Sequence, residues 1–245
     1  MLRGLFSASF RNNAVALETD HVGASLRRRR QPRILIALDV ESGKEVWRFK
    51  VNLEKGAPFL AMRGLAYYKQ PEKNGPCAER ILLNTQDARL IALDAHTGAL
   101  CQGFGLSGQV SLLTGMGDVT PGYYYVTSAP TIVRGRVVLG GCVVDNQYWG
   151  EPSGVVRAFD AVTGNLAWAW DVGRPERHGE PPPGDSYTRS TPNSWAPMSA
   201  DEKLGLVYVP YTSPAGRQFV VLAVGGSSIF QTKRGDYIIA YALQD

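Results

Sequence analysis

The sequence predicts an all-β protein, a β-propeller with about four to five blades' worth of strands. Three observations lead to this prediction. A phrase of the form A-[LF]-D-x-x-[ST]-G occurs three times, 27 Gly and 15 Pro interrupt the 245 residues, and convincing amphipathic helical patterns are missing. Frequent turn residues between short β-rich runs favour hairpins over long helices.

Residues 1–30 come before the first repeat and are expected to form a poorly ordered basic leader. They show little hydrophobic alternation and end in four arginines, Arg27 to Arg30. This order of charged and apolar residues is not that of a secretory signal. A nucleic-acid patch or a targeting signal is the alternative for the arginine run. A solvated leader is the simpler interpretation, so no nucleic-acid partner is expected.

Residues 31–245 are expected to form the propeller domain, built on the three repeats. These read ALDVESGKEVW at 37–47, ALDAHTGALCQ at 92–102 and AFDAVTGNLAW at 158–168. Each predicts a strand, a tight turn capped by the aspartate, a glycine with positive φ, and a second strand. Trp47 and Trp168 end two of the repeats, where an indole can wedge between neighbouring blades. Offsets of 55 and 66 residues between repeats suit four-stranded blades with loop insertions.

Other β-rich runs supply the remaining strands. RILLNTQDARLIAL at 80–93 predicts a hairpin with a polar turn, and APTIVRGRVVLGG at 129–141 predicts two joined strands. LGLVYVPY at 204–211 and FVVLAVGG at 219–226 indicate further strands. DYIIAYAL at 236–243 resembles the first half of the repeat and is placed to close a ring. No apolar run reaches the roughly 18 residues of a membrane helix, so no transmembrane segment is expected in this chain.

The cysteines and histidines do not indicate a metal centre. Cys77, Cys101 and Cys142 show no CxxC or CxxH spacing, which argues against zinc. Their odd number leaves at least one thiol outside any internal disulfide, and the redox compartment stays open. The three histidines lack partners at useful spacing and are expected on the surface or in loops.

The repeat and five less repetitive stretches resemble one known family. The pattern A-x-D-x-x-[ST]-G-x-x-x-W is similar to the tryptophan-docking repeat of dehydrogenases that use pyrroloquinoline quinone (PQQ). The other stretches look like the membrane-bound glucose/quinate/shikimate dehydrogenase branch: MRGLAYY at 62–68, PGYYYVTSAPTIVRGRVVLGG at 121–141, VVDNQYWGEPSGVVRAFDAVTG at 143–164, TPNSWAPMSADEKLGLVYVP at 191–210 and GGSSIFQTKRGDYIIAYAL at 225–243. The resemblance covers the chain from Ile34 to its end.

This resemblance implies a quinoprotein dehydrogenase, an eight-bladed propeller with PQQ and a divalent cation, Mg²⁺ or Ca²⁺, on its axis. It implies oxidation of a sugar or cyclitol hydroxyl, of the glucose or quinate/shikimate type, with electron transfer to ubiquinone. The expected location is the periplasmic face of the inner membrane, although the chain itself shows no signal sequence or membrane anchor.

The resemblance also marks six candidate site residues: Arg63, Thr127, Ser128 and Trp195 for the cofactor, and Asp145 and Asn146 for the metal. A guanidinium suits the planar carboxylates of PQQ, an indole suits its ring face, and hydroxyls can hydrogen-bond its oxygens. A carboxylate and an amide oxygen are hard ligands, which Mg²⁺ and Ca²⁺ prefer. By residue type alone, the same positions also fit a surface arginine, turn-forming hydroxyls, an Asp-Asn turn and a core indole.

Two departures from the family bear on activity. Phe59 stands where the family has a histidine, four residues before Arg63, and a phenyl ring cannot hydrogen-bond a substrate. VYVPYTSPAG at 207–216 passes directly to RQFVVLAVGG, so an internal deletion is expected near 216–217. In the family, the segment that would lie there carries an aspartate base and a lysine that contacts the quinone. No catalytic residue is therefore assigned in this chain.

These departures leave two hypotheses. The first is a PQQ-dependent dehydrogenase with impaired turnover, because alcohol oxidation needs a base that removes the hydroxyl proton. The second is a noncatalytic propeller fragment or binding scaffold. An incomplete ring also leaves strand edges open, which predicts self-association through those edges.

Overall fold

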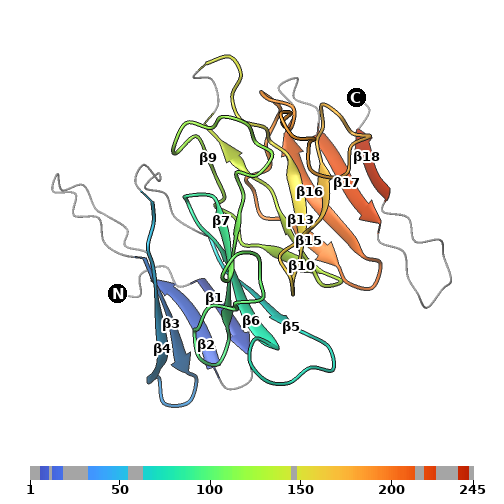
Figure 1. The fold of residues 1–245 in the computed structure, drawn as a ribbon. Helices are drawn as coiled ribbons and strands as arrows, with labels where there is room; N and C mark the ends of the chain where they lie inside the picture. Colours follow the sequence, from blue (N-terminus) through green and yellow to red (C-terminus); the bar gives the residue numbers. More distant parts are fainter. Residues whose placement is uncertain are drawn as a thin grey trace.

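Strands and turns account for all of the regular structure that the computed structural model describes, in residues 6–10, 13–18, 33–54, 63–144, 148–212, 218–224 and 237–242. This confirms the all-β prediction. The strands form four four-stranded antiparallel sheets, each a propeller blade, and one two-stranded ribbon. Figure 1 shows the blades following one another in sequence order, from the blue N-terminal sheet to the red C-terminal sheet.

Each blade is a meander in which strands adjacent in the sheet follow one another along the chain, apart from ribbon strand β12 within blade 3. Blade 1 contains β1 (Phe6–Phe10), β2 (Asn13–Glu18), β3 (Arg33–Asp39) and β4 (Glu45–Val51); blade 2 contains β5 (Ala66–Lys69), β6 (Glu79–Asn84), β7 (Arg89–Asp94) and β8 (Gln109–Ser111); blade 3 contains β10 (Thr131–Val133), β11 (Arg136–Leu139), β13 (Val156–Asp160) and β14 (Leu166–Trp170); blade 4 contains β15 (Ser199–Asp201), β16 (Leu206–Thr212), β17 (Gln218–Val224) and β18 (Tyr237–Ala242). The ribbon pairs β9 (Tyr124–Tyr125) with β12 (Cys142–Val143).

The first strands of successive blades lie side by side: β1 contacts β5, β5 contacts β10, and β10 contacts β15. This is the inner-strand arrangement of a propeller, whose blades repeat radially around one axis. Because each blade contains an even number of antiparallel strands, the inner strands run in the same direction. The residues just before β5, β10 and β15 therefore lie at one end of the axis.

Blade 1 takes its two inner strands from residues 1–30, the segment expected to be a poorly ordered leader. β2 pairs with β3 along its whole length, with Leu17 opposite Leu35. The order of the rest of residues 1–30 stays a prediction. The deletion expected near 216–217 falls between β16 and β17, outside the described residues.

Among the residues whose side chains are described, apolar clusters fill the spaces between the blades. All six residues of β6 are buried, because blade 2 packs against a neighbour on each face. Ile81 and Leu83 belong to the cluster shared with blade 1, and Leu82 belongs to the cluster shared with blade 3. Successive residues of a strand point to opposite faces of the sheet. A strand in a blade that packs against a neighbour on each face therefore needs a nearly continuous apolar run. Between blades 3 and 4, Trp170 packs edge-on against Tyr211 with ring centroids 5.0 Å apart.

The repeated turns have the predicted capping geometry. One oxygen of the Asp94 carboxylate accepts hydrogen bonds from the amide and the hydroxyl of Thr97, both at 2.9 Å, and the other accepts from the Cys77 amide. Burial acts to raise the pKa of Asp94, but these donors hold it below its usual value. Asp39 and Asp160 cap their own turns in the same way.

Trp47 docks on the next blade, as its position in the repeat predicts. Its indole N–H donates to the Ala95 carbonyl oxygen at 3.0 Å. Its ring also covers Gly98, where an added Cβ would lie 2.6 Å from Trp47 Cε3. Gly98 has a φ of +70°, so this glycine serves both the left-handed turn and the close contact with the ring.

The second repeat has an exposed Gln102 in the tryptophan position. Phe104 and Gly105, which follow shortly after Gln102, make the contacts with the next blade instead. Phe104 is fully buried in the cluster between blades 2 and 3, and the Gly105 amide donates to the Thr163 carbonyl oxygen at 2.8 Å. The interface between blades 2 and 3 therefore uses a phenyl ring and a backbone hydrogen bond where the interface before it uses an indole.

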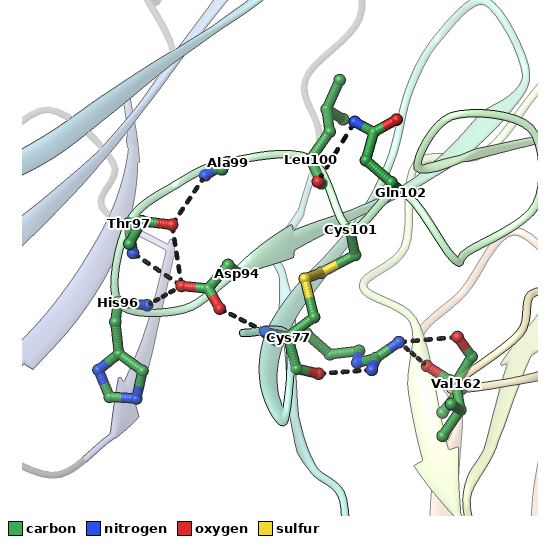
Figure 2. Close-up of a disulfide and its surroundings, with 11 residues drawn as sticks. Cys77, Asp94, His96, Thr97, Ala99, Leu100, Cys101, Gln102 and Val162 are labelled. Atoms are coloured by element: carbon green, nitrogen blue, oxygen red, sulfur yellow. Dashed lines mark hydrogen bonds between the residues drawn. A yellow bond between two sulfur atoms is a disulfide. The ribbon is translucent and has the colours of Figure 1, made fainter. Parts of the chain in front are cut away.

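A disulfide between Cys77 and Cys101 braces this region, joining the loop before β6 to the segment after β7. Figure 2 shows the bridge beside the Asp94 turn, with the Asp94 carboxylate bonded on one side to Thr97 and on the other to Cys77. Arg80, which is buried, donates to the carbonyl oxygens of Ala161 and Val162 in the blade 3 turn at 3.0 and 2.9 Å. The disulfide thus lies next to the clamp that ties blade 2 to blade 3.

Reducing the disulfide is expected to lower the free energy of unfolding by about 3 kcal/mol, because it closes a loop across a sequence separation of 24 residues. Urea denaturation with and without dithiothreitol measures this loss. The Cys77→Ala/Cys101→Ala variant should unfold at the midpoint of the reduced protein and show no further response to dithiothreitol. Cys142→Ala, a thiol outside the bridge, should keep the full response. A dithiothreitol response that survives in the double variant would contradict a stabilising role of this bridge.

Candidate cofactor site

Four of the six candidate residues lie at the entries to three inner strands. Arg63 precedes β5, Thr127 and Ser128 precede β10, and Trp195 precedes β15. Because these entries lie at one end of the propeller axis, residues far apart in the sequence share one site.

The carbonyl oxygen of Trp195 is the centre of this group. It accepts hydrogen bonds from the Ser128 hydroxyl at 2.6 Å, from Arg63 Nη1 at 3.0 Å and from the Thr127 hydroxyl at a longer 3.5 Å. The Arg63 amide in turn donates to the Thr127 carbonyl oxygen at 2.7 Å. Residues that lead into blades 2 and 3 therefore hold one backbone position of the segment that leads into blade 4.

Arg63 also stacks on the Trp195 side chain. Its guanidinium carbon lies 4.7 Å from the centroid of the indole ring, within the range of cation–π attraction. Trp195 keeps 48% of its surface exposed, so the indole is not a core side chain. The site therefore presents a cation and an open aromatic face together.

The hydroxyls of Thr127 and Ser128 act on this site through the backbone of Trp195. Both residues are buried, and both hydroxyls are directed at the same carbonyl oxygen rather than into a local turn. Since that oxygen belongs to Trp195, the two hydroxyls hold the backbone of the residue whose indole is half-exposed.

Asp145 and Asn146, the metal candidates, lie outside the described residues, as does Phe59. The chain reaches them from the ribbon, where the Val144 amide donates to the Tyr123 carbonyl oxygen at 3.0 Å. The strand opposite leads directly to Thr127. In the described ranges, no group of three or more His, Cys, Asp or Glu side chains could hold a metal ion. The described part of the chain also contains no helix long and apolar enough to cross a membrane.

Asn84 supports the site and was not singled out from the sequence. It ends β6, is fully buried, and donates from Nδ2 to the Val126 carbonyl oxygen at 2.8 Å. This bond anchors the backbone one residue before Thr127. The signal that points to it is a polar residue at the end of an otherwise apolar run, ILLN, because a buried amide is kept where it has a hydrogen-bonding task.

The chemistry of these residues fits a flat, polyanionic quinone. One N–H of Arg63 donates to the Trp195 carbonyl oxygen, and the guanidinium has further N–H groups that can donate to a carboxylate or carbonyl oxygen. Within the described residues, no carboxylate forms an ion pair with Arg63. The half-exposed indole beside it offers the aromatic surface on which a planar ring packs.

Comparison with known proteins shows the family to which the chain belongs. The family described as "Glucose/ethanol/alcohol dehydrogenase, beta-propeller domain" matches residues 21–223. The glycerol dehydrogenase large subunit of Gluconobacter oxydans (strain 621H) is 45% identical over 192 residues, which cover 77% of this chain and 26% of that protein. The quinoprotein glucose dehydrogenase of Escherichia coli (strain K12) is 41% identical over 184 residues, covering 72% and 23%. The quinate/shikimate dehydrogenase (quinone) of Acinetobacter baylyi is 38% identical over 197 residues, covering 73% and 24%.

The chain spans about a quarter of the length of these curated relatives. Among solved structures, the quinohemoprotein alcohol dehydrogenase from Comamonas testosteroni matches with a TM-score of 0.59 at 19% identity, covering 91% of this chain and 33% of that one. At that identity the likeness shows the propeller fold alone. The family match over most of the sequence shows more: the chain belongs to the PQQ-dependent glucose/ethanol/alcohol dehydrogenase β-propeller family.

Proposed function

We propose that the chain contributes a PQQ site to the oxidation of a hydroxyl on a sugar or cyclitol, of the glucose or quinate/shikimate type. The observation that carries the proposal is the convergence of Arg63, Ser128 and Trp195 at one end of the propeller axis. When bound, PQQ would supply the acceptor for the hydride equivalent that leaves the alcohol carbon.

The residues of the site have separate tasks in this proposal. Arg63 binds an anionic or carbonyl oxygen of the cofactor with the N–H donors that Trp195 does not use. Trp195 packs its open face against the ring system, and Ser128 and Thr127 hold the backbone of Trp195 through its carbonyl oxygen.

Asp145 and Asn146 are the proposed ligands of Mg²⁺ or Ca²⁺. Their support is chemical, because a carboxylate and an amide oxygen suit hard cations, and a cation beside the quinone would polarise a carbonyl oxygen. Their place in the chain also supports this role, because Asp145 follows the ribbon strand β12, whose partner strand β9 leads to Thr127.

Ubiquinone is the proposed electron acceptor, and the periplasmic face of the inner membrane is the proposed location. The name of the Acinetobacter baylyi relative, a quinate/shikimate dehydrogenase (quinone), supports a quinone acceptor. The Cys77–Cys101 disulfide supports an oxidising compartment, because such bonds persist outside the reducing cytosol.

A noncatalytic scaffold is the second candidate function. Its support is that, within the described residues, no carboxylate forms a hydrogen bond or an ion pair with Arg63 or Trp195, while alcohol oxidation requires an acceptor for the hydroxyl proton. Binding of PQQ and turnover therefore have to be measured separately.

Thermal unfolding with PQQ and Ca²⁺ or Mg²⁺ measures binding, and dye-linked oxidation of glucose, quinate and glycerol measures turnover. We expect Tm to rise by about 5–10 °C at a PQQ concentration 100-fold above Kd. Asp145→Ala should remove the dependence of this shift on the divalent cation. A shift with turnover supports the dehydrogenase, a shift without turnover supports the scaffold, and an unchanged Tm overturns the cofactor site.

A further inference from the structure

The segment 191–195 lies on the connection between blades 3 and 4 and ends at the tryptophan of the candidate cofactor site. Its backbone passes very close to two glycines of blade 3. A Cβ added to Gly154 would lie 1.8 Å from the Pro192 carbonyl oxygen, and one added to Gly140 would lie 2.1 Å from the Ser194 carbonyl oxygen. Neither glycine has a positive φ. The space that the segment occupies, rather than a turn conformation, therefore requires glycine at these two positions.

Tyr211, in β16 of blade 4, holds this segment from the other side. Its buried hydroxyl donates to the Pro192 carbonyl oxygen at 2.5 Å. Burial raises the pKa of Tyr211, so the hydroxyl keeps its proton at neutral pH and remains a donor. The ring has a separate task, because it packs edge-on against Trp170. Removing the hydroxyl alone therefore leaves the packing of the ring in place.

Ser194 makes a second bond to the same strand, one residue before Trp195. It is buried, and its hydroxyl donates to the Pro210 carbonyl oxygen at 2.7 Å. Ser199, the first residue of β15, lies opposite Tyr208, so Pro210 lies beyond the pairing of β15 with β16. A serine hydroxyl therefore bonds a carbonyl oxygen that the neighbouring strand does not reach.

The residue after Ser194 carries the acceptor on which the cofactor site converges. The Trp195 carbonyl oxygen accepts hydrogen bonds from Arg63 Nη1 and from the Ser128 hydroxyl. Little chain lies between Ser194 and this oxygen to absorb a displacement. A shift of the segment would therefore move the oxygen that anchors the Arg63 guanidinium.

We propose that Ser194 and Tyr211 are positioning residues of the candidate cofactor site. Their hydroxyls hold the backbone of residues 192–194 on blade 4, and this sets the place of the Trp195 carbonyl oxygen and of the Arg63 guanidinium bonded to it. The inference rests on the proposed PQQ site, and it links the interface between blades 3 and 4 to the affinity for the cofactor.

Titration of the full chain with PQQ and Ca²⁺ tests the proposal. Tyr211→Phe and Ser194→Ala should each raise the Kd by about 3- to 10-fold, because binding then has to order a backbone that one hydrogen bond no longer holds. Gly43→Ala is the control for lost stability, since it strains a turn of blade 1 and has nothing within 4 Å of its Cβ. Its Kd should equal that of the wild type. Wild-type affinity in both hydroxyl variants, or an equal rise in Gly43→Ala, overturns the proposal.

The Arg63→Met variant separates positioning from a general effect on the fold. If Ser194 acts through the carbonyl oxygen that anchors Arg63, Ser194→Ala should change the Kd by less than about 2-fold once the guanidinium is gone. A general loosening of the fold would instead give the full rise in both backgrounds. The full rise in the Arg63→Met background therefore overturns the positioning role of Ser194.

A measurement without PQQ separates this inference from the proposed function. The five tryptophans can be labelled as 5-fluorotryptophan, and Trp195→Phe assigns the ¹⁹F resonance of Trp195. Tyr211→Phe should shift this resonance. Tyr187→Phe is the matched control, because Tyr187 is also buried and its hydroxyl has no hydrogen-bond partner among the described residues. Failure of the wild type to bind PQQ would refute the proposed function, whereas an unmoved Trp195 resonance in Tyr211→Phe, or an equal shift in both tyrosine variants, overturns positioning by Tyr211.

Discussion

Replacing Arg63 with methionine is expected to weaken PQQ binding by about 10- to 100-fold. The variant keeps most of the side-chain length but removes a charge-assisted hydrogen-bond donor and the cation stacked on Trp195. Quenching of tryptophan fluorescence on titration with PQQ in the presence of Ca²⁺ measures the affinity.

Two further arginine variants make this result specific. Arg63→Lys keeps the charge but loses the planar fork, so its affinity should lie between those of the wild type and Arg63→Met. Arg48→Met is the matched control, because Arg48 is an exposed arginine of blade 1 that pairs with Glu45 at 2.5 Å. Wild-type affinity in Arg63→Met would rule out the assigned contact. A similar loss in Arg48→Met would indicate general charge attraction instead.

Gly98→Ala is expected to lower the free energy of unfolding by about 3–5 kcal/mol. The substitution strains a backbone with a φ of +70° and drives a methyl group into the Trp47 ring, at 2.6 Å from Cε3. The predicted consequence is a displaced indole and loss of its 3.0 Å hydrogen bond to Ala95. Urea denaturation measures the change in stability.

Gly43→Ala separates the two causes. Gly43 has the same place in the first repeat and a φ of +68°, but nothing lies within 4 Å of the position of its Cβ. This variant should lose only about 1–2 kcal/mol, the cost of the left-handed backbone. The difference between the two variants gives the contribution of tryptophan docking, and equal losses would show that the Trp47 ring yields to the extra methyl group.

The features predicted successfully from the sequence are those whose cause is local. The capped turns at Asp39, Asp94 and Asp160 follow from a short pattern within one hairpin, and the docking of Trp47 follows from its fixed distance from that turn. The inner strands of blade 1 gave a weaker signal. FSASF and NAVALE are short, and small residues blur their alternation.

The tertiary features could not be derived from the pattern. The resemblance named Arg63, Ser128 and Trp195, but their meeting at one carbonyl oxygen depends on how three blades are set around the axis. Three cysteines allow several pairings, and only the fold brings Cys77 beside Cys101. Nothing in the second repeat indicates that Phe104 and Gly105 replace a tryptophan, because their role depends on the turn of the following blade.

The side-by-side order of β1, β5, β10 and β15 has a further consequence for how this protein tolerates change. In a row of blades that contact only their neighbours, the free energy of unfolding is close to a sum. Each blade contributes one term, and each interface between consecutive blades contributes another. A substitution at the contact between Trp47 and Gly98 therefore changes only the term for the interface between blades 1 and 2. Sequence changes in blade 1 can therefore accumulate without disturbing the contact between Trp170 and Tyr211, which lies between blades 3 and 4 and contributes a separate term.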